Sequence, residues 1–359
     1  MTETTKSTPT PATTAPHDAS STPRRKRLLA IRFSALGDVA MTIPVIYSVA
    51  RAYPELEIYV ATRPLFARLF VNPPANVMVI PFDIKEKYNG VGGLLGIARR
   101  LGALHPDYVA DLHDVLRSWL LAEYFKLKDA RVGLVNKDRR NRDLVFAGGR
   151  PQRPYIDRYF DVFDSLGFPA SRTFRSIYEG SEAPKPAIEI KHPAIGIAPF
   201  ARYATKTYPA EKMSKVVDTL AARGYNVYLF GARGAEAEML RSWQKERVTS
   251  VAGQFDLAGE LATINALDLM VSMDSANQHL AALVDTPVLS IWGSTTPACG
   301  FLGYNQTAPA DTVMLTLPCQ PCSIAGDKKC PRGTLDCLRS IPPTAIVEAI
   351  SQKVPLPKK

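Results

Sequence analysis

Asp38 is the first residue in the chain whose type and position could do chemistry. It follows the apolar run Leu28–Phe33 and a turn that contains Ser34 and Gly37. Side chains just beyond the end of a buried strand often line a binding cleft in α/β proteins. The Asp38 carboxylate could act there as a general base. It could equally cap the helix that starts beside it, which is the more common use of such a residue. The residues alone leave both roles open.

Lys206 lies in the loop Pro199–Pro209, which mixes cations with hydroxyl side chains and has no apolar periodicity. Cations and hydroxyls together suit the negative charge of a diphosphate. A solvated surface loop has the same composition, however, and composition alone favours that second interpretation.

The stretch Asp274–His279 joins the apolar run Leu269–Met273 to a segment with helical periodicity. Small residues at such a junction allow a phosphate to approach the free N–H groups of a helix N-terminus. Asp274 could accept hydrogen bonds from sugar hydroxyls or cap the helix, and His279 could be an ordinary core histidine. The pattern leaves a binding site and a structural role equally open.

Four thiols are clustered near the C-terminus, at Cys319, Cys322, Cys330 and Cys337. Four cysteines in one loop could hold a structural Zn²⁺, although the spacing differs from the two C-x2-C pairs of a zinc ribbon. Reduced thiols in a folded loop are the alternative. No His or carboxylate cluster accompanies the cysteines, so we do not expect a catalytic zinc.

Short apolar runs alternate with helical segments along the whole chain, which predicts the α/β class with two parallel sheets covered by helices on both faces. The Pro-rich segment 181–193 is the expected linker. We therefore expect Rossmann-like domains at 28–180 and 194–341, the second containing the Cys-rich loop 319–337, and a closing helix and tail at 342–359. Ligands bind beyond the carboxyl ends of parallel strands, so two facing halves would place the site in the cleft between them.

Charge and composition limit the partners. The 359-residue chain has a net charge of +10, which suits nucleotide phosphates, acidic glycolipids or an anionic membrane surface. No arginine-rich block interleaved with aromatic residues occurs in the body, so we do not expect nucleic acid as a partner. Residues 1–27 predict a disordered tail, because the Thr, Ser, Pro and Ala there offer little apolar surface to bury.

The sequence lacks the apolar stretch of a secretory signal and any run of about 18 apolar residues. We therefore expect a cytoplasmic protein, with peripheral contact to the inner face of the cytoplasmic membrane. The sequence also lacks a P-loop, a G-x-S-x-G elbow and the protein-kinase motifs. No D-x-D stretch is present to hold a divalent metal against a diphosphate.

In their order along the chain, these stretches resemble glycosyltransferase family 9, the ADP-heptose:lipopolysaccharide heptosyltransferases, over roughly Leu28 to Ile350. The matching stretches are Ile31–Val39 (R-x-S-x-x-G-D in the family), Asp111–His113 (D-L-x), Lys206–Pro209 (K-x-W-P, here with Tyr208), Asp274–Ala281 (D-T-G-x-x-H-L-A) and Gly293–Pro297 (G-x-T-x-P). No single stretch is specific, but the ordered set is.

The resemblance implies a GT-B architecture and an inverting, metal-independent glycosyltransferase that requires no cofactor. It would move heptose from ADP-heptose, the nucleotide-sugar donor, onto a lipopolysaccharide core or a related glycolipid or oligosaccharide acceptor. Carried over by position, Asp38 is the general base, in an acceptor-side loop with Arg32, Ser34 and Gly37. The implied donor-side residues are Lys206 for the phosphates, Glu236 for the ribose, Asp274 for the sugar, and the backbone of Ser275, Ala276 and Asn277 before His279 for the diphosphate.

Three departures from the family pattern leave the donor open. Ala276 stands where the family has glycine, Asn277 and Gln278 form a variant that resembles a subset of the family, and Ala201 and Arg202 stand where the family has hydroxyl residues. Two other functions remain as alternatives. One is a sugar-nucleotide epimerase or hydrolase on the same fold, and the other is a non-catalytic binding module with a zinc-held tail.

Overall fold

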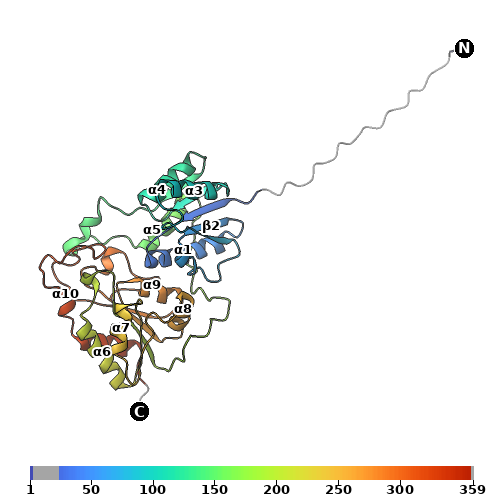
Figure 1. Cartoon of the computed structure of the whole chain (residues 1–359). Helices are drawn as coiled ribbons and strands as arrows, with labels where there is room; N and C mark the ends of the chain where they lie inside the picture. The colour runs from blue at the N-terminus through green and yellow to red at the C-terminus, as the bar shows by residue number, and fades with distance from the viewer. Residues whose placement is uncertain (3–23, 357–359) are drawn as a thin grey trace.

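The chain forms two lobes, each built on a parallel β-sheet (Figure 1). The first lobe runs from blue to green in the figure and the second from yellow to red. The computed structural model describes residues 1–2 and 24–356, except for the side chain of Ala147. The predicted α/β class with two parallel-sheet domains is confirmed. Most of the predicted tail 1–27 lies outside the described residues.

The first sheet has five parallel strands, namely β1 (Arg27–Ile31), β2 (Glu57–Thr62), β3 (Val77–Pro81), β4 (Tyr108–Asp111) and β5 (Arg131–Leu134). They lie in the order β3-β2-β1-β4-β5, so β1 is central. Ile31 pairs with Ala61 on one side and with Asp111 on the other. The residues after these three strands therefore emerge together at the carboxyl edge of the sheet, where ligands bind in such folds.

Helices cover both faces of this sheet, namely α1 (Leu36–Ala52), the short α2 (Pro64–Ala67), α3 (Gly90–Gly102), α4 (Leu116–Lys126) and α5 (Tyr155–Ser165). The 3-10 helix η1 (Arg142–Gly148) lies between β5 and α5 in the chain. The inner sides of α3 and α4 share one apolar core with the sheet. α1 and α5 pack together on the opposite face.

The second sheet has six parallel strands, namely β6 (Ala194–Ala198), β7 (Asn226–Leu229), β8 (Val248–Ser250), β9 (Leu269–Met273), β10 (Val288–Ile291) and β11 (Thr312–Val313). Their order is β11-β10-β9-β6-β7-β8. The elements around it are η2 (Ala204–Lys206), α6 (Ala210–Arg223), α7 (Ala235–Ser242), α8 (Leu257–Asn265), α9 (Ala276–Leu283), η3 (Pro297–Cys299), α10 (Asp336–Arg339) and α11 (Pro343–Lys353). α11 packs against α6, within the second domain.

The two domains meet where α1 packs on α9. Every residue of α1 from Val39 to Ala50 is buried, because the helix lies between its own sheet and the second domain. A helix that is apolar on all sides requires such an environment. Pro44 lies inside this helix and removes one backbone donor from it, yet the helix continues, and the Ser48 hydroxyl donates to the Pro44 carbonyl at 2.7 Å.

Residues before α5 and around η3 also join the domains. The Gln152 N–H donates to the Ala298 carbonyl at 2.8 Å, and the Tyr155 N–H donates to the Gly300 carbonyl at 2.9 Å. The Tyr155 ring stacks on Phe301 with 4.5 Å between ring centroids. These contacts fix the first domain against the loop after β10.

The long periodic elements agree with the sequence predictions, and the differences lie at ends and in short elements. α1 begins at Leu36, two residues before Asp38, which places Asp38 in its first turn. Arg27, predicted to belong to the tail, is the first residue of β1. The predicted linker 181–193 contains no helix or strand. Within the described part of the chain, no helix has the length and apolar character needed to cross a bilayer.

Candidate active site

A cavity of about 520 Å³ lies between the carboxyl ends of the two sheets. All the sequence-predicted site residues except Ser34 line it, namely Arg32, Gly37 and Asp38 from the first domain and Lys206, Glu236, Asp274, Ser275, Ala276, Asn277 and His279 from the second. The structure therefore brings together residues that lie more than 200 positions apart in the chain. It does so because parallel sheets place all their strand ends at one edge.

Asp38 occupies the first turn of α1 and is held by two groups of its own domain. Its Oδ2 accepts the Ala35 N–H at 3.0 Å and lies 2.9 Å from Nη2 of Arg32. Among the described residues, Oδ1 has no hydrogen-bond partner. Burial opposes ionisation, but the Arg32 guanidinium, the Ala35 N–H and nearby His279 together lower the pKa of Asp38. The carboxylate thus caps its helix with one oxygen and leaves the other for a ligand.

Arg32 is buried, with 5% of its surface exposed, and all its side-chain nitrogens contact protein groups. Nε donates to the Ser34 carbonyl at 2.7 Å, and Nη1 donates to the Leu112 carbonyl. The third nitrogen faces Asp38. Because its donors are used within the domain, Arg32 positions the Asp38 carboxylate and supplies the adjacent positive charge.

Gly37 lies where the first turn of α1 packs directly on α9. A β-carbon added at Gly37 would lie 2.8 Å from Cδ2 of His279 and 3.3 Å from Cα of Ala276. A side chain at position 37 would therefore push α1 away from α9. Only glycine lets the first turn of α1, which carries Asp38, reach the start of α9.

Lys206 and Asp274 form an ion pair on the second domain. Nζ of Lys206 lies 2.8 Å from Oδ2 of Asp274, and their side chains are 15% and 4% exposed. The same carboxylate oxygen accepts the Thr295 hydroxyl at 2.6 Å, and Oδ1 accepts from the Gln278 amide at 3.2 Å. These contacts fit a carboxylate that orients Lys206 toward the cavity.

The N-terminal turn of α9 opens into the cavity. Ser275 is the N-cap residue, and its side chain makes no capping hydrogen bond. Ser275, Ala276 and Asn277 all line the space, and the first N–H groups of a helix have no partner within it. His279 follows on the same helix. Burial, aided by Lys206, lowers the pKa of His279 to about 4. The imidazole is therefore neutral at physiological pH.

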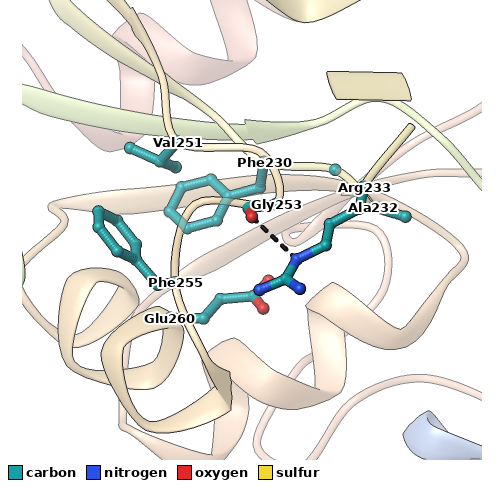
Figure 2. Close-up of a pocket in the computed structure, with 8 residues that line it drawn as sticks. Phe230, Ala232, Arg233, Val251, Gly253, Phe255 and Glu260 are labelled. Carbon is teal, nitrogen blue, oxygen red and sulfur yellow. Dashed lines mark hydrogen bonds between the residues drawn. The ribbon is translucent and has the colours of Figure 1, made fainter. Parts of the chain in front are cut away.

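Glu236 lines this cavity and contacts the turn that lines a second, smaller one. Its Oε2 accepts the Ala232 N–H at 2.7 Å, across the turn after β7. Figure 2 shows the neighbouring pocket of about 170 Å³. Phe230, Val251 and Phe255 form its apolar walls, while Arg233 and Glu260 form a polar edge. The Arg233 Nε donates to the Gly253 carbonyl at 3.1 Å.

Comparisons with known proteins show the family of the chain. The family model described as "Glycosyltransferase family 9 (heptosyltransferase)" matches residues 94–330. The chain belongs to glycosyltransferase family 9. One curated relative, lipopolysaccharide heptosyltransferase 3 of Escherichia coli, is 28% identical over 290 residues, which cover 72% of this chain and 81% of the relative. The enzyme class predicted from the sequence, a glycosyltransferase, is thus confirmed.

Solved structures confirm the GT-B fold of this glycosyltransferase. A family 9 glycosyltransferase from Veillonella parvula is 18% identical, with a TM-score of 0.69 over 92% of this chain and 97% of the other. The E. coli heptosyltransferase WaaC, solved with ADP, is also 18% identical, with a TM-score of 0.67 over 91% of this chain and 100% of that one. WaaC has also been solved with ADP-2-deoxy-2-fluoro heptose.

Several cavity residues of the enzyme were missed by the sequence predictions. Lys137 and Tyr155 line the space from the first domain. Burial is the main cause that lowers the pKa of Lys137, and the nearby Arg32 cation contributes.

Ser34, which the sequence predicted as a site residue, does not line the cavity. Its hydroxyl lies 3.1 Å from Nε2 of His113 instead. Burial lowers the pKa of His113 to about 3. The contact between half-buried Ser34 and buried His113 braces the turn before Asp38.

The Cys-rich loop of this glycosyltransferase supports the Lys206 loop. The Thr205 hydroxyl donates to the Gly326 carbonyl. A β-carbon at Gly326 would lie 2.2 Å from Cδ of Lys206. Ala325 of the same loop lines the cavity. The loop therefore fixes the stem of the Lys206 side chain, a function that no local pattern in the sequence indicated.

The structure gives no support to the zinc interpretation of the four clustered cysteines. The thiols of Cys319, Cys322, Cys330 and Cys337 line one small cavity. Across residues 1–2 and 24–356, however, no group of three or more His, Cys, Asp or Glu side chains could hold a metal ion. All five cysteines of the chain are free thiols. We therefore derive no role for a metal from this loop.

Proposed function

We propose that this enzyme is an inverting, metal-independent heptosyltransferase that moves heptose from ADP-heptose onto a lipopolysaccharide core saccharide. The observation that carries the proposal is the position of Asp38, whose carboxylate shares one cavity with Lys206 and the N-terminus of α9. A base and a diphosphate site facing each other suit the direct displacement of a nucleoside diphosphate from a sugar. The names of the E. coli relatives support the choice of sugar and acceptor.

In this mechanism, Oδ1 of Asp38 takes the proton from an acceptor hydroxyl as its oxygen bonds to the anomeric carbon of the donor. The bond between that carbon and the phosphate oxygen breaks on the opposite face, so the configuration inverts. Asp38 is ionised at neutral pH because its pKa is lowered. It accepts the proton only as bond formation makes the hydroxyl acidic.

The leaving diphosphate gains negative charge in the transition state. The Lys206 ammonium, oriented by Asp274 at 2.8 Å, and the N–H groups of Ser275 to Asn277 are placed to stabilise it. Preorganised donors of this kind supply the charge stabilisation that Mg²⁺ provides in other transferases. Asp274 could also contact the sugar, because it lines the cavity.

We assign the pocket in Figure 2 to the adenine of the donor. Its apolar walls, formed by Phe230, Val251 and Phe255, suit the faces of a planar base. Arg233 and Glu260 lie at the polar edge of the pocket, where they would form hydrogen bonds with the edge of the base. Glu236 lies between this pocket and the diphosphate site, the position expected for a ribose contact. The lipid-linked acceptor would enter from the first domain.

The proposal is tested by incubating the full chain with ADP-heptose and a purified core saccharide that lacks its outer heptose. ADP release should require the acceptor and persist in EDTA, and NMR of the product should show the opposite anomeric configuration to that of the donor. ADP release at the same rate without acceptor would identify a hydrolase. Turnover restricted to a different nucleotide sugar would overturn the assignment of the donor.

A further inference from the structure

Five large apolar side chains are exposed on two neighbouring helices of the first domain. Val91 and Leu95 of α3 are 76% and 61% exposed, and Leu116, Trp119 and Leu120 of α4 are 73%, 44% and 40% exposed. We call these five residues the α3–α4 face. Single exposed apolar residues are normal, but a group of this kind marks an interaction site.

The spacing of these residues places each set on one side of its helix. Val91 and Leu95 are four positions apart, and Leu116, Trp119 and Leu120 follow the i, i+3, i+4 pattern. The opposite sides of both helices are already buried in the core of their own domain. α3 and α4 pack side by side at the outside of the lobe (Figure 1). The exposed side chains therefore do not contribute to the core of the first domain.

The charges around the face are mainly positive. The exposed cations on the two helices and beside them are Lys85, Lys87, Arg99, Arg100, Lys126 and Lys128. Arg99 continues the Val91–Leu95 stripe by one helical turn, and Lys126 lies two turns beyond Trp119. Exposed Glu86 and Asp129 and half-buried Asp83 and Glu123 oppose them, so six exposed cations face four acids and positive charge exceeds negative around the face. Apolar and aromatic side chains with flanking cations are typical of surfaces that bind anionic bilayers.

The face adjoins the candidate active site. Both helices begin at the carboxyl edge of the first sheet, where the cavity opens. Lys137 lines the cavity, and its Nζ donates to the carbonyl of Asp114, two residues before α4, at 3.2 Å. The exposed apolar residues lie in the first halves of α3 and α4, toward this edge. A surface held by the face would thus lie beside the acceptor side of the cleft.

We propose that the α3–α4 face docks on an anionic lipid bilayer, with the apolar side chains in the interfacial layer and the cations over the headgroups. The inference rests on the proposed function in one respect, since a lipid-linked acceptor would be presented by such a surface. Docking through this face brings the cleft to the saccharide while the second domain stays clear of the bilayer to bind the donor.

The test is cosedimentation of the full chain with vesicles of phosphatidylglycerol and phosphatidylethanolamine, compared with vesicles of phosphatidylcholine. Wild type should bind the anionic vesicles, and added NaCl should weaken binding because salt screens the cations. The double variant Trp119→Ser and Leu120→Ser should lower the partition coefficient at least about tenfold. The matched control is Met239→Ser on α7, since Met239 is 43% exposed on the other domain. This control should bind like wild type.

Vesicle binding needs neither donor nor acceptor, so it can succeed or fail independently of heptosyl transfer. The double variant should retain the melting temperature of wild type and its turnover of a delipidated, soluble acceptor. A second variant, Leu95→Ser, alters an exposed position of α3 and should reduce the apolar contribution without changing the charge of the face. Absence of wild-type binding to anionic vesicles, or unchanged binding of both variants, would overturn the proposal. So would a dimer that the double variant dissociates, because the face would then bind a second copy.

Discussion

The backbone of Gly37 packs against the ring of His279, so that a β-carbon at position 37 would lie 2.8 Å from Cδ2 of that ring. This contact joins the first turn of α1, which carries Asp38, to the helix whose N-terminus faces the cavity. Because position 37 has no side chain, the proposed base and the proposed diphosphate site can lie this close together.

Replacing Gly37 by alanine should therefore separate the two halves of the site. We expect kcat/KM to fall roughly 10²-fold, because a misplacement of about 1 Å has that effect on catalysis. We also expect overpacking to lower stability by about 1–3 kcal/mol. Steady-state kinetics and urea unfolding measure the two effects.

The control for this substitution is Gly92→Ala in α3. A β-carbon there meets nothing within 4 Å. Alanine has the higher helix propensity, by up to about 1 kcal/mol, so Gly92→Ala should leave activity unchanged and stability equal or higher. Normal kinetics in Gly37→Ala would show that the ring of His279 can move aside without consequence.

Asp38→Asn separates the two roles that the sequence left open for this residue. Asparagine can still accept the Ala35 N–H that Asp38 accepts at 3.0 Å, so capping of α1 is largely retained. It cannot take a proton from the acceptor. Turnover should fall by about 10²–10⁴, while ADP affinity, measured by calorimetry, stays at the wild-type value. Full turnover would show that Asp38 serves only as a cap.

The sequence was sufficient to predict the elements with strong periodicity and the edge at which their polar ends meet. Asp38, Lys206 and Asp274 each follow an apolar run, and a parallel sheet places such positions at one edge. Their convergence on one cavity therefore follows from the fold class. The short strands β8 and β11 carry too few residues for a periodic signal, and they were not predicted.

The contacts that set the roles of individual side chains were beyond such reasoning. Arg32 contacts the Leu112 carbonyl, and Tyr155 stacks on Phe301 of the other domain. Pairs so distant in the chain depend on the packing of whole domains, about which local sequence carries no information. For the same reason, nothing in the sequence indicated that Gly326 packs on the stem of Lys206.

Arg32 should control the pH dependence of turnover through Asp38. Although burial opposes ionisation of Asp38, the Arg32 cation helps to hold its pKa below the ordinary value. The acid limb of kcat/KM, which reports the base of the free enzyme, should therefore lie below pH 3.8, the ordinary pKa of aspartate. Arg32→Gln removes the positive charge, so the pKa of Asp38 should rise and the limb should move to higher pH.

Arg32→Lys is the control because it retains a positive charge, and its limb should stay near that of wild type. Both variants lose hydrogen bonds to buried carbonyls, so their general loss of rate and stability should be similar. The two variants should therefore differ mainly in the pH at which the acid limb of kcat/KM lies. A limb at the same pH in both variants would mean that Arg32 acts only by packing.

His279 should make the fold sensitive to acid. Burial is the main cause that lowers the pKa of His279 to about 4 in the folded state, whereas the ordinary pKa of a histidine side chain is 6.5. The unfolded state therefore binds a proton more readily, and the contribution of His279 to stability is fully present above pH 6.5 and decreases as pH falls toward 4. From these values, the free energy of unfolding at pH 5 should be roughly 2 kcal/mol smaller than at pH 8 through His279 alone.

Urea unfolding of wild type and variants at both pH values measures this effect. In His279→Gln, the difference between the two free energies of unfolding should shrink by this amount. In the control His105→Asn, which alters an exposed histidine, the difference should be that of wild type. His113, with a pKa lowered to about 3 by burial, should preserve part of the acid sensitivity in both variants. An undiminished difference in His279→Gln would show that the imidazole is already protonated in the folded enzyme and that its pKa is not lowered by burial.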